Sequence, residues 1–384
     1  MKKILTIAGT ILFLVFACKD KYNPPLSGEA ARLLVVEGIV MGGAPAPTTI
    51  FLSRLANFSD STPRPLERNA TIQLTTGNGG NYPFREAAPG VYQTDTLTIP
   101  IGTICQLHIT TADGKEYASD EVEMLPATNI DEINYLRKNQ DVHFYVNAHG
   151  EANEPRYYFW KFESTYEYNS QYFLFKKFIT ADCTMVNRST EEANLYYRCW
   201  KSDPQTTIAV ASSAGLSDNV IYQAPLHEIP YSDIRMDVGY SMLLKQYAIS
   251  ETAYAYWSNL RKITEELGGI FGPLPSEVKG NLHCLTNPEE AVIGFVSASS
   301  EKEKRQFFYR PPDWQYFFNC GLPDSANNMN TMLKPKLYTL FGPKGGWPVY
   351  FNNNPYDTPG VMYSRMCIQC DLRGGSNIKP PFWP

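Results

Sequence analysis

Residues 157–168, YYFWKFESTYEY, carry the pattern that decides the fold class of this chain. Every second position is aromatic with one exception, and this set comprises Tyr158, Trp160, Phe162, Tyr166 and Tyr168. The intervening positions are mainly polar and include Lys161, Glu163, Thr165 and Glu167. Because successive side chains of a strand point to opposite faces, this period of two predicts a long strand with one buried face. The functional alternative is a sugar-stacking platform, but the regular alternation favours a role in the core.

The part of the chain before this stretch reads as consecutive short strands. β-Branched or alternating segments occur at 33–40, 48–54, 70–75, 90–94, 105–110 and 115–119. Turn-forming residues separate them, and the Asp113-Gly114 pair is a strong hairpin signal. No useful helical pattern lies between residues 33 and 125. We therefore predict an N-terminal β-sandwich of the immunoglobulin-like or transthyretin-like kind over residues 32–127.

Residues 128–384 are predicted to form a larger, β-rich C-terminal domain with one amphipathic helix near 250–267. Ser250 is the expected N-cap of this helix, and Gly268-Gly269 would end it. Its apolar stripe is typical of a helix packed on its own sheet. From residue 341 onward, Gly, Pro, Asn and aromatic residues indicate an irregular segment tied by disulfides. The predicted fold class is therefore mainly β.

The length, composition and charge of the chain limit the classes of protein to which it can belong. The chain has 384 residues, 19% of them charged and 13% aromatic, which is globular composition. Its length suggests two or more domains. The formal net charge of −5 argues against a nucleic-acid binder, which normally carries a basic face.

The pattern of the N-terminal residues predicts that the chain is exported. Lys2 and Lys3 precede an apolar stretch at 4–17, which is shorter than the roughly 20 residues of a spanning helix. We therefore predict a signal peptide over residues 1–17. The alternative is an ordinary signal with a chance cysteine, but Val15-Phe16-Ala17-Cys18 resembles a bacterial lipobox. This resemblance implies a diacylglycerol on Cys18, residues 18–31 as a tether, and attachment to the outer membrane through the lipid.

The residues after Cys18 bear on which side of the membrane the chain faces. Lys19 and Asp20 resemble the surface-export signal of Bacteroidota lipoproteins. That resemblance implies an outer-membrane, lipid-anchored protein that faces the cell exterior.

Seven cysteines remain once Cys18 is set aside, and an exported chain allows disulfides. Cys105 lies in an alternating segment and is expected to be a buried thiol. The other six are disulfide candidates, with Cys183 and Cys199 as the best local pair; the remaining four are Cys284, Cys320, Cys367 and Cys370.

Cys367 and Cys370 form a CxxC, for which a redox pair and half of a zinc site are the functional alternatives. No second CxxC or HxxxH is present to complete a zinc site, and the loop that follows argues against a redox motif. We therefore expect Cys284, Cys320, Cys367 and Cys370 to form up to two structural disulfides, whose pairing the sequence does not determine.

No established catalytic motif is present. His143 and His149 lie too far apart on one strand to share a metal, and His227-Glu228 precedes Pro230, which excludes a helical HExxH. GxSxG, P-loop and GxGxxG motifs are absent. The sequence therefore predicts no enzyme activity, no metal site and no cofactor.

Two groups of residues remain candidates for modification or binding. Asp60-Ser61-Thr62, Asp95-Thr96-Leu97 and Asp324-Ser325-Ala326 resemble the O-glycosylation site of Bacteroidota, which would modify Ser61, Thr96 and Ser325. Loop aromatics could form a binding platform or pack between domains, and they are Trp314, Tyr316, Trp347 and Tyr350.

Several stretches occur in the order found in one known family. They are the lipobox with its Tyr22-Asn23-Pro24 tether, residues 34–39, 50–54, 90–92, 130–131, 254–260, 280–295, 370–375 and 381–383. Together they resemble the Bacteroidota lipoproteins grouped as domain-of-unknown-function family 4249. The family supplies no catalytic residues. Its members are typically encoded beside TonB-dependent receptors, which implies an accessory role in uptake.

These observations give three functional hypotheses. The first is a non-enzymatic, surface-exposed subunit of a TonB-dependent transporter or other outer-membrane barrel complex, which supports the barrel or captures substrate. The second is a stand-alone glycan- or peptide-binding surface lipoprotein. The third is a hydrolase with an unrecognised site. A stable complex with a barrel, an exposed aromatic cleft, or a convergent catalytic pocket would distinguish them.

Overall fold

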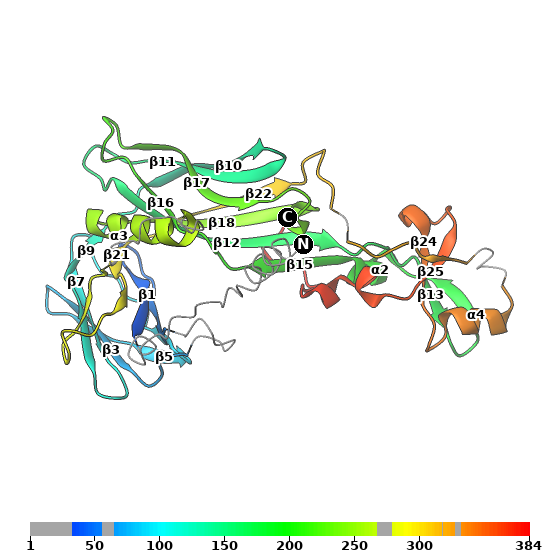
Figure 1. Ribbon diagram of the computed structural model, residues 1–384, viewed down its shortest axis with the longest axis horizontal. Coiled ribbons are helices and arrows are strands. Elements are labelled where there is room, and N and C mark those ends of the chain that lie inside the picture. Colours follow the sequence, from blue (N-terminus) through cyan, green and yellow to red (C-terminus); the bar gives the residue numbers. More distant parts are fainter. Residues whose placement is uncertain (1–32, 56–64, 267–278, 317, 327–331) are drawn as a thin grey trace, which may run out of the picture.

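The computed structural model of the chain describes residues 33–55, 65–266, 279–316, 318–326 and 332–384. The chain is mainly β, as predicted, and forms three parts in an elongated arrangement (Figure 1). We call them the N-terminal sandwich, the central body and the distal lobe.

The N-terminal sandwich consists of two sheets joined at one edge, where β7 pairs with both β8 and β9. Its strands from the first third of the chain are β1 (Leu34–Met41), β2 (Thr49–Arg54), β3 (Thr71–Thr76), β4 (Asn81–Pro83), β5 (Arg85–Ala88), β6 (Val91–Gln93), β7 (Ile104–Thr110), β8 (Glu116–Ser119) and β9 (Val122–Leu125). Alternate side chains of β3 and β7 are buried, as the sequence pattern predicts. The Asp113-Gly114 hairpin is also confirmed, with Thr110 opposite Glu116.

A later segment completes the sandwich. After the central body, the chain returns as β19 (Leu282–Cys284), β20 (Ile293–Gly294) and β21 (Ser297–Ser299). β19 pairs with β8, and β21 runs parallel to both β1 and β9. The boundary predicted at residues 127–128 had assigned these strands to the C-terminal domain. Backbone pairing instead inserts them into the first sheet system, because β1 and β8 offer free strand edges there.

The central body is a second β-sandwich. One sheet has the order β10–β11–β17, from β10 (Asn129–Lys138), β11 (Asp141–His149) and β17 (Val220–Ile229). The other has the order β15–β12–β18–β22, with β16 beside β12; its strands are β12 (Tyr157–Asn169), β15 (Arg198–Asp203), β16 (Ala209–Ser212), β18 (Gly239–Ala248) and β22 (Lys302–Tyr309). A short 3-10 turn, η2 (Ile234–Met236), precedes β18.

The aromatic face of β12 lies in the core between these two sheets, so the predicted core role is confirmed. Tyr158 and Trp160 stack with their ring centroids 5.7 Å apart. The indole N–H of Trp160 donates to Oε1 of Gln246 at 2.7 Å. This bond satisfies the one polar atom that burial of the ring removes from water.

Helix α3 (Glu251–Arg261) lies between the body and the N-terminal sandwich, and a π-helical turn, Lys262–Glu266, extends it. Ser250 caps it as predicted, because its hydroxyl accepts the Ala253 N–H at 3.1 Å. One face packs on Phe159 of β12, and Tyr256 contacts Phe295 of the returning segment, with ring centroids 5.4 Å apart. The helix therefore packs on its own sheets, as its stripe predicts. None of the helices described is long and apolar enough to cross a membrane.

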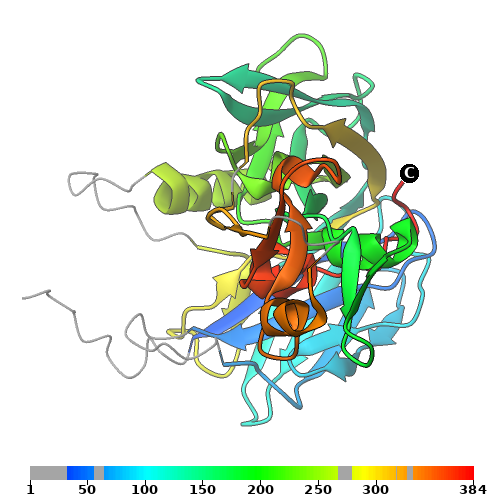
Figure 2. The same ribbon diagram turned by 90° about the vertical axis from the view of Figure 1, so that its right-hand side faces the viewer.

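The distal lobe consists of residues 172–197, 318–326 and 332–368 and projects from one end of the body (Figures 1 and 2). Its elements are β13 (Lys176–Ile179), β14 (Thr184–Asn187), α2 (Thr190–Tyr197), β23 (Asp324–Ser325), α4 (Lys334–Phe341), β24 (Trp347–Tyr350), η5 (Phe351–Asn353), β25 (Pro359–Met362) and η6 (Arg365–Cys367). The chain then returns to the body through η7 (Cys370–Arg373), and Trp383 donates to the buried carboxylate of Glu167 at 3.1 Å.

Candidate functional site

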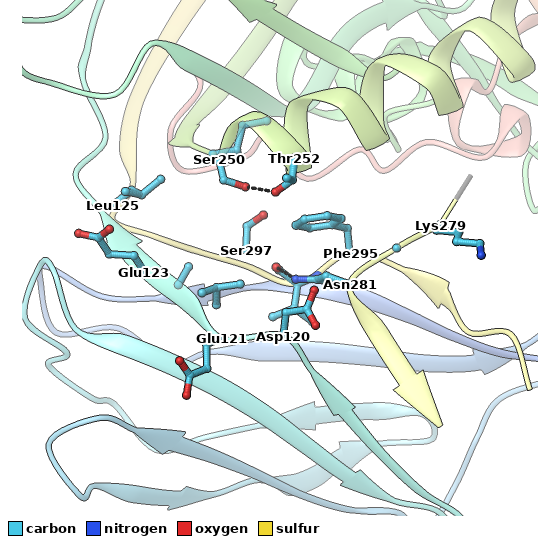
Figure 3. Close-up of a pocket in the computed structure, with 15 residues that line it drawn as sticks. Asp120, Glu121, Glu123, Leu125, Ser250, Thr252, Lys279, Asn281, Phe295 and Ser297 are labelled. Carbon is cyan, nitrogen blue, oxygen red and sulfur yellow. Dashed lines mark hydrogen bonds between the residues drawn. The ribbon is translucent and has the colours of Figure 1, made fainter. Parts of the chain in front are cut away.

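A cavity of about 490 Å³, which we call the junction cleft, opens between the N-terminal sandwich and the first turn of α3 (Figure 3). Its walls come from three regions that are distant in sequence. They are the segment 120–125, the start of α3 at 249–252, and the returning segments 279–281 and 295–298. The cleft therefore exists only because the returning strands lie beside the N-terminal sheet.

Two features fix the base of the junction cleft. Asn281 is buried, accepts the Val296 N–H at 2.8 Å and donates to the Val296 carbonyl at 2.9 Å. Gly280 lies so close to the neighbouring backbone that a Cβ there would be 1.8 Å from the Gly294 oxygen. Gly294 itself has φ of +135° and faces the Val36 carbonyl, so both positions require glycine.

The cleft combines an acidic rim with a partly apolar base. Asp120, Glu121 and Glu123 are exposed on one side, and Asp120 accepts a hydrogen bond from Nε2 of His283 at 2.8 Å. The Phe295 ring is buried at the base. Ser297 is also buried, its hydroxyl has no partner among the described residues, and Figure 3 shows it directed toward the start of α3.

This arrangement is suited to binding a polar ligand. Carboxylates and a free hydroxyl can accept or donate hydrogen bonds to a polar ligand, while the ring supplies apolar contact. Among the described residues that line the cleft, no hydroxyl or thiol is hydrogen-bonded to a histidine. The nucleophile–base arrangement of hydrolases is therefore not found in this part of the structure.

The four predicted platform aromatics do not form a common surface. Trp314 is fully buried in the body core, where its indole N–H donates to the Asp233 carbonyl at 3.1 Å. Tyr350 is buried in the distal lobe against Phe175. Tyr316 and Trp347 are partly buried at different places, Trp347 beside a cavity of about 410 Å³ in the lobe. The platform prediction is wrong, because two of its rings have their faces covered.

The disulfides in the structure differ from the predicted local pair of Cys183 and Cys199. Cys199 is bonded to Cys370, and Cys320 to Cys367, so the predicted Cys183–Cys199 bridge is wrong. Cys199 points into the body core from β15, while Cys183 lies in the turn between β13 and β14. Cys183 and Cys284 are free thiols.

Each cysteine of the CxxC therefore serves a different bridge. One closes the distal lobe, and the other ties the segment after the lobe to the body. The structural interpretation of the CxxC is confirmed over the redox and zinc alternatives. Cys105 is fully buried, as predicted, and burial raises the pKa of its thiol to about 11.

The predicted modification sites are only partly within the described residues. Thr96 and Ser325 are exposed, which is the accessibility that a glycosylation site needs. Ser61, Cys18, Lys19 and Asp20 lie outside the described residues, as do the predicted signal peptide and tether.

The distal lobe exposes large apolar side chains that the sequence did not single out. Tyr356 is 96% exposed, Leu322 82% and Leu333 80%. Others with substantial exposure are Val186, Leu195, Tyr338, Tyr363 and Met366. We call these eight residues the lobe surface. Their exposure depends on the tertiary fold, so no local pattern in this segment rich in Gly, Pro and Asn could identify them.

One group of described residues could hold a metal ion, and it lies outside the junction cleft. Ligand atoms of Asp141, His143 and Glu228 all lie within 4.8 Å of one another on the β10–β11–β17 sheet. A comparison of histidines within one strand cannot reveal this group, because Glu228 lies on the neighbouring strand. The i,i+2 spacing of Asp141 and His143 was visible, but the strand opposite them was not.

Comparison with known protein families shows a match over most of the chain. The family model described as "Domain of unknown function (DUF4249)" matches residues 19–305. This range includes the N-terminal sandwich, nearly all of the central body and the first part of the distal lobe. The C-terminal stretches that resemble the same family, at 370–375 and 381–383, lie beyond it.

Comparisons with curated proteins and with solved structures give no support for a function. No curated protein matches the chain. Among solved structures, a DUF4785 family protein from Legionella pneumophila matches with 8% identity and a TM-score of 0.16. That match covers 56% of this chain and 52% of the Legionella protein, so it spans about half the length of each.

Proposed function

This chain belongs to the DUF4249 family, and we propose that it is a lipid-anchored, surface-exposed outer-membrane protein. In this proposal it acts as a non-enzymatic accessory or substrate-capture subunit of a TonB-dependent transporter. The lipid on Cys18 would hold the chain at the membrane, so the folded parts need no apolar face for anchoring.

The lobe surface is the observation that carries this proposal. Isolated exposed apolar residues are common, but the small distal lobe has eight large ones, five of them more than half exposed, and this concentration favours a protein contact. Tyrosine and methionine are enriched at such contacts, and the lobe surface contains both types. Because anchoring uses the lipid, we assign this surface to a barrel partner.

The junction cleft supports the substrate-capture part of the proposal. Its acidic rim and its free Ser297 hydroxyl suit a neutral or cationic polar ligand and disfavour an anionic one. The elements that line the cleft, in the N-terminal sandwich and at the start of α3, lie at the opposite end of the molecule from the distal lobe (Figure 1). A partner at the lobe would therefore leave the cleft accessible.

The test is a mild-detergent purification of the tagged, lipidated protein from native outer membranes, followed by mass spectrometry. We expect a TonB-dependent receptor in stoichiometric amount. The double variant Leu322→Glu and Tyr356→Glu should lose the receptor, because each change places a charge in a contact that excludes water. Tyr222→Glu is the matched control, since Tyr222 is 75% exposed on the body.

Two results would contradict the proposal. One is recovery of the protein alone from membranes that still yield other intact complexes. The other is a receptor complex that survives the lobe variant as well as it survives the control. The first result would favour the stand-alone binding hypothesis.

A further inference from the structure

We propose that Asp141, His143 and Glu228 form a zinc-binding site on the β10–β11–β17 sheet of the central body. The three side chains offer one imidazole nitrogen and two carboxylate oxygens, a donor set that zinc takes in proteins. This site does not depend on the proposed function.

Strand geometry brings the three residues together. Asp141 and His143 are two residues apart on β11, so they share a face of the sheet. Glu228 on β17 lies directly opposite His143 in the antiparallel register. Side chains at such opposite positions are neighbours, which is why residues far apart in sequence converge here.

The distances suit a tetrahedral ion. Nδ1 of His143 lies 3.4 Å from Oε2 of Glu228. Zinc bonds of about 2.0–2.2 Å at the tetrahedral angle place two ligand atoms about 3.4 Å apart. One ligand atom from each of the three residues lies within 4.8 Å of the others, so side-chain rotation would bring Asp141 to the ion as the third ligand.

Asp141 is already oriented by the backbone. One of its oxygens, Oδ1, accepts the Tyr231 N–H at 2.7 Å. A ligand carboxylate held in this way leaves its second oxygen for the metal, which is the usual arrangement around protein metal sites. Tyr231 lies two residues after the end of β17, and Asp141 begins β11, so the same hydrogen bond joins the ends of the two strands.

Two cations near the site, Lys138 opposite Asp141 and Arg261 beside the same cavity as His143, have other contacts. The Lys138 ammonium lies 5.2 Å from the centre of the Tyr145 ring, and Arg261 donates to the Val210 carbonyl at 3.2 Å. Without a metal, His143 pairs directly with Glu228, since its Nδ1 lies 3.4 Å from Oε2 at the surface. Such a pair contributes little, so zinc can replace it at low cost.

A cavity of about 350 Å³ borders two of the ligands. His143 and Glu228 both line it, beside Thr207 and Pro225. With three protein ligands, a tetrahedral zinc keeps one position for water or a small ligand, and this cavity gives that position space. Zinc would also clamp β17, which is the edge strand of its sheet, to β11.

The test is zinc titration of the full mature protein, without a histidine tag, by isothermal calorimetry. We expect saturable binding that His143→Ala and Glu228→Gln each reduce by one equivalent. His149→Ala is the matched control, because His149 lies on the same strand and pairs with a single carboxylate, that of Asp131. Glu228 is largely exposed, so its variant should fold normally even if the histidine variant does not.

Cobalt provides a second readout that ordinary ion pairing would not give. Co²⁺ bound at this site should show visible absorption bands of tetrahedral intensity, and both ligand variants should lose them. Zinc should raise the melting temperature of the wild type and of His149→Ala, because it binds the folded state. The proposal is overturned if the wild type shows no saturable zinc binding, or if the ligand variants bind as the wild type does.

Discussion

In the N-terminal sandwich, strands of both sheets contribute side chains to one continuous core, whereas the distal lobe divides its buried apolar side chains between two small clusters. The sandwich keeps Cys105 and Cys284 as buried free thiols. The lobe contains the Cys320–Cys367 bridge, and the Cys199–Cys370 bridge fastens the chain just beyond it.

The difference shows how size decides the means of stabilisation. A larger unit buries enough apolar area to offset chain entropy, while a small unit of short strands needs cross-links that restrict the unfolded chain. A small core also leaves large apolar side chains outside, as on the lobe surface. This contrast fits the proposal that the lobe, and not the sandwich, contacts a partner protein.

The largest effect is expected from opening the bridge within the lobe. Its cysteines are 47 residues apart, and a loop of that length corresponds to about 4 kcal/mol of stabilisation. The double variant Cys320→Ala and Cys367→Ala should therefore lose most hydrogen-exchange protection in the lobe. Amides of β1 to β9 should keep theirs.

Cys183→Ser is the control for this change, since Cys183 is a free thiol of the same lobe. Equal loss of protection in sandwich and lobe would show that the two regions unfold as one unit. The contrast drawn between them would then fail.

Removing a core side chain from the sandwich should have the next largest effect. Leu107 is fully buried, and Leu107→Ala should lower the free energy of unfolding by about 3 kcal/mol, since it leaves a cavity among close-packed side chains. Leu322→Ala on the lobe surface should change it by less than about 0.5 kcal/mol. Urea denaturation measures both, and a similar loss for the two variants would contradict the assignment of core and surface.

The thiols themselves give a third comparison. Burial raises the pKa of Cys105 to about 11 from the ordinary value of 9.0, so at pH 8 it holds about 100-fold less thiolate than an ordinary thiol. Iodoacetamide should label Cys183, which is only partly buried, much faster than Cys105 in the folded protein. Mass spectrometry of the labelled peptides measures the ratio, and equal rates would mean that the sandwich core opens readily.

The same shift predicts a pH dependence with a definite sign. Because the folded pKa of Cys105 is higher than the unfolded value, the stabilisation from its neutral thiol is complete below pH 9. It is lost as pH rises toward 11, since the unfolded state then releases the proton more easily. Cys105→Ala should show a shallower fall in stability over this interval, and an unchanged slope would argue against the shift.

The smallest effect concerns α3, which contacts the sandwich but not the lobe. Ser250→Ala removes the acceptor for the Ala253 N–H and should cost about 1 kcal/mol. The exposed Ser217→Ala is the control. Hydrogen exchange should show faster opening at the start of α3 and no change in the lobe. A change in the lobe instead would mean that the two regions are coupled through the body.

Local sequence patterns predicted most of the strands well. They could not predict which strands pair, or which cysteines bond, when the partners lie far apart in the sequence. The alternation at 157–168 and the cap at Ser250 depend on neighbours in sequence, so one sequence suffices to find them. The partner of Cys199, the strand opposite His143 and the return of residues 282–299 depend on which segments meet in the fold. For the same reason, the platform prediction mistook the buried Trp314 for a loop aromatic exposed to ligand.

The central claim, that the lobe contacts a barrel partner, is tested most directly by site-specific photo-crosslinking in native outer membranes. A crosslinking amino acid would replace Tyr356 on the lobe or, in a separate strain, Tyr222 on the body, since both side chains are largely exposed. We predict that position 356 captures a TonB-dependent receptor and that position 222 does not. Capture of the receptor from position 222 alone, or from neither position, would contradict the account.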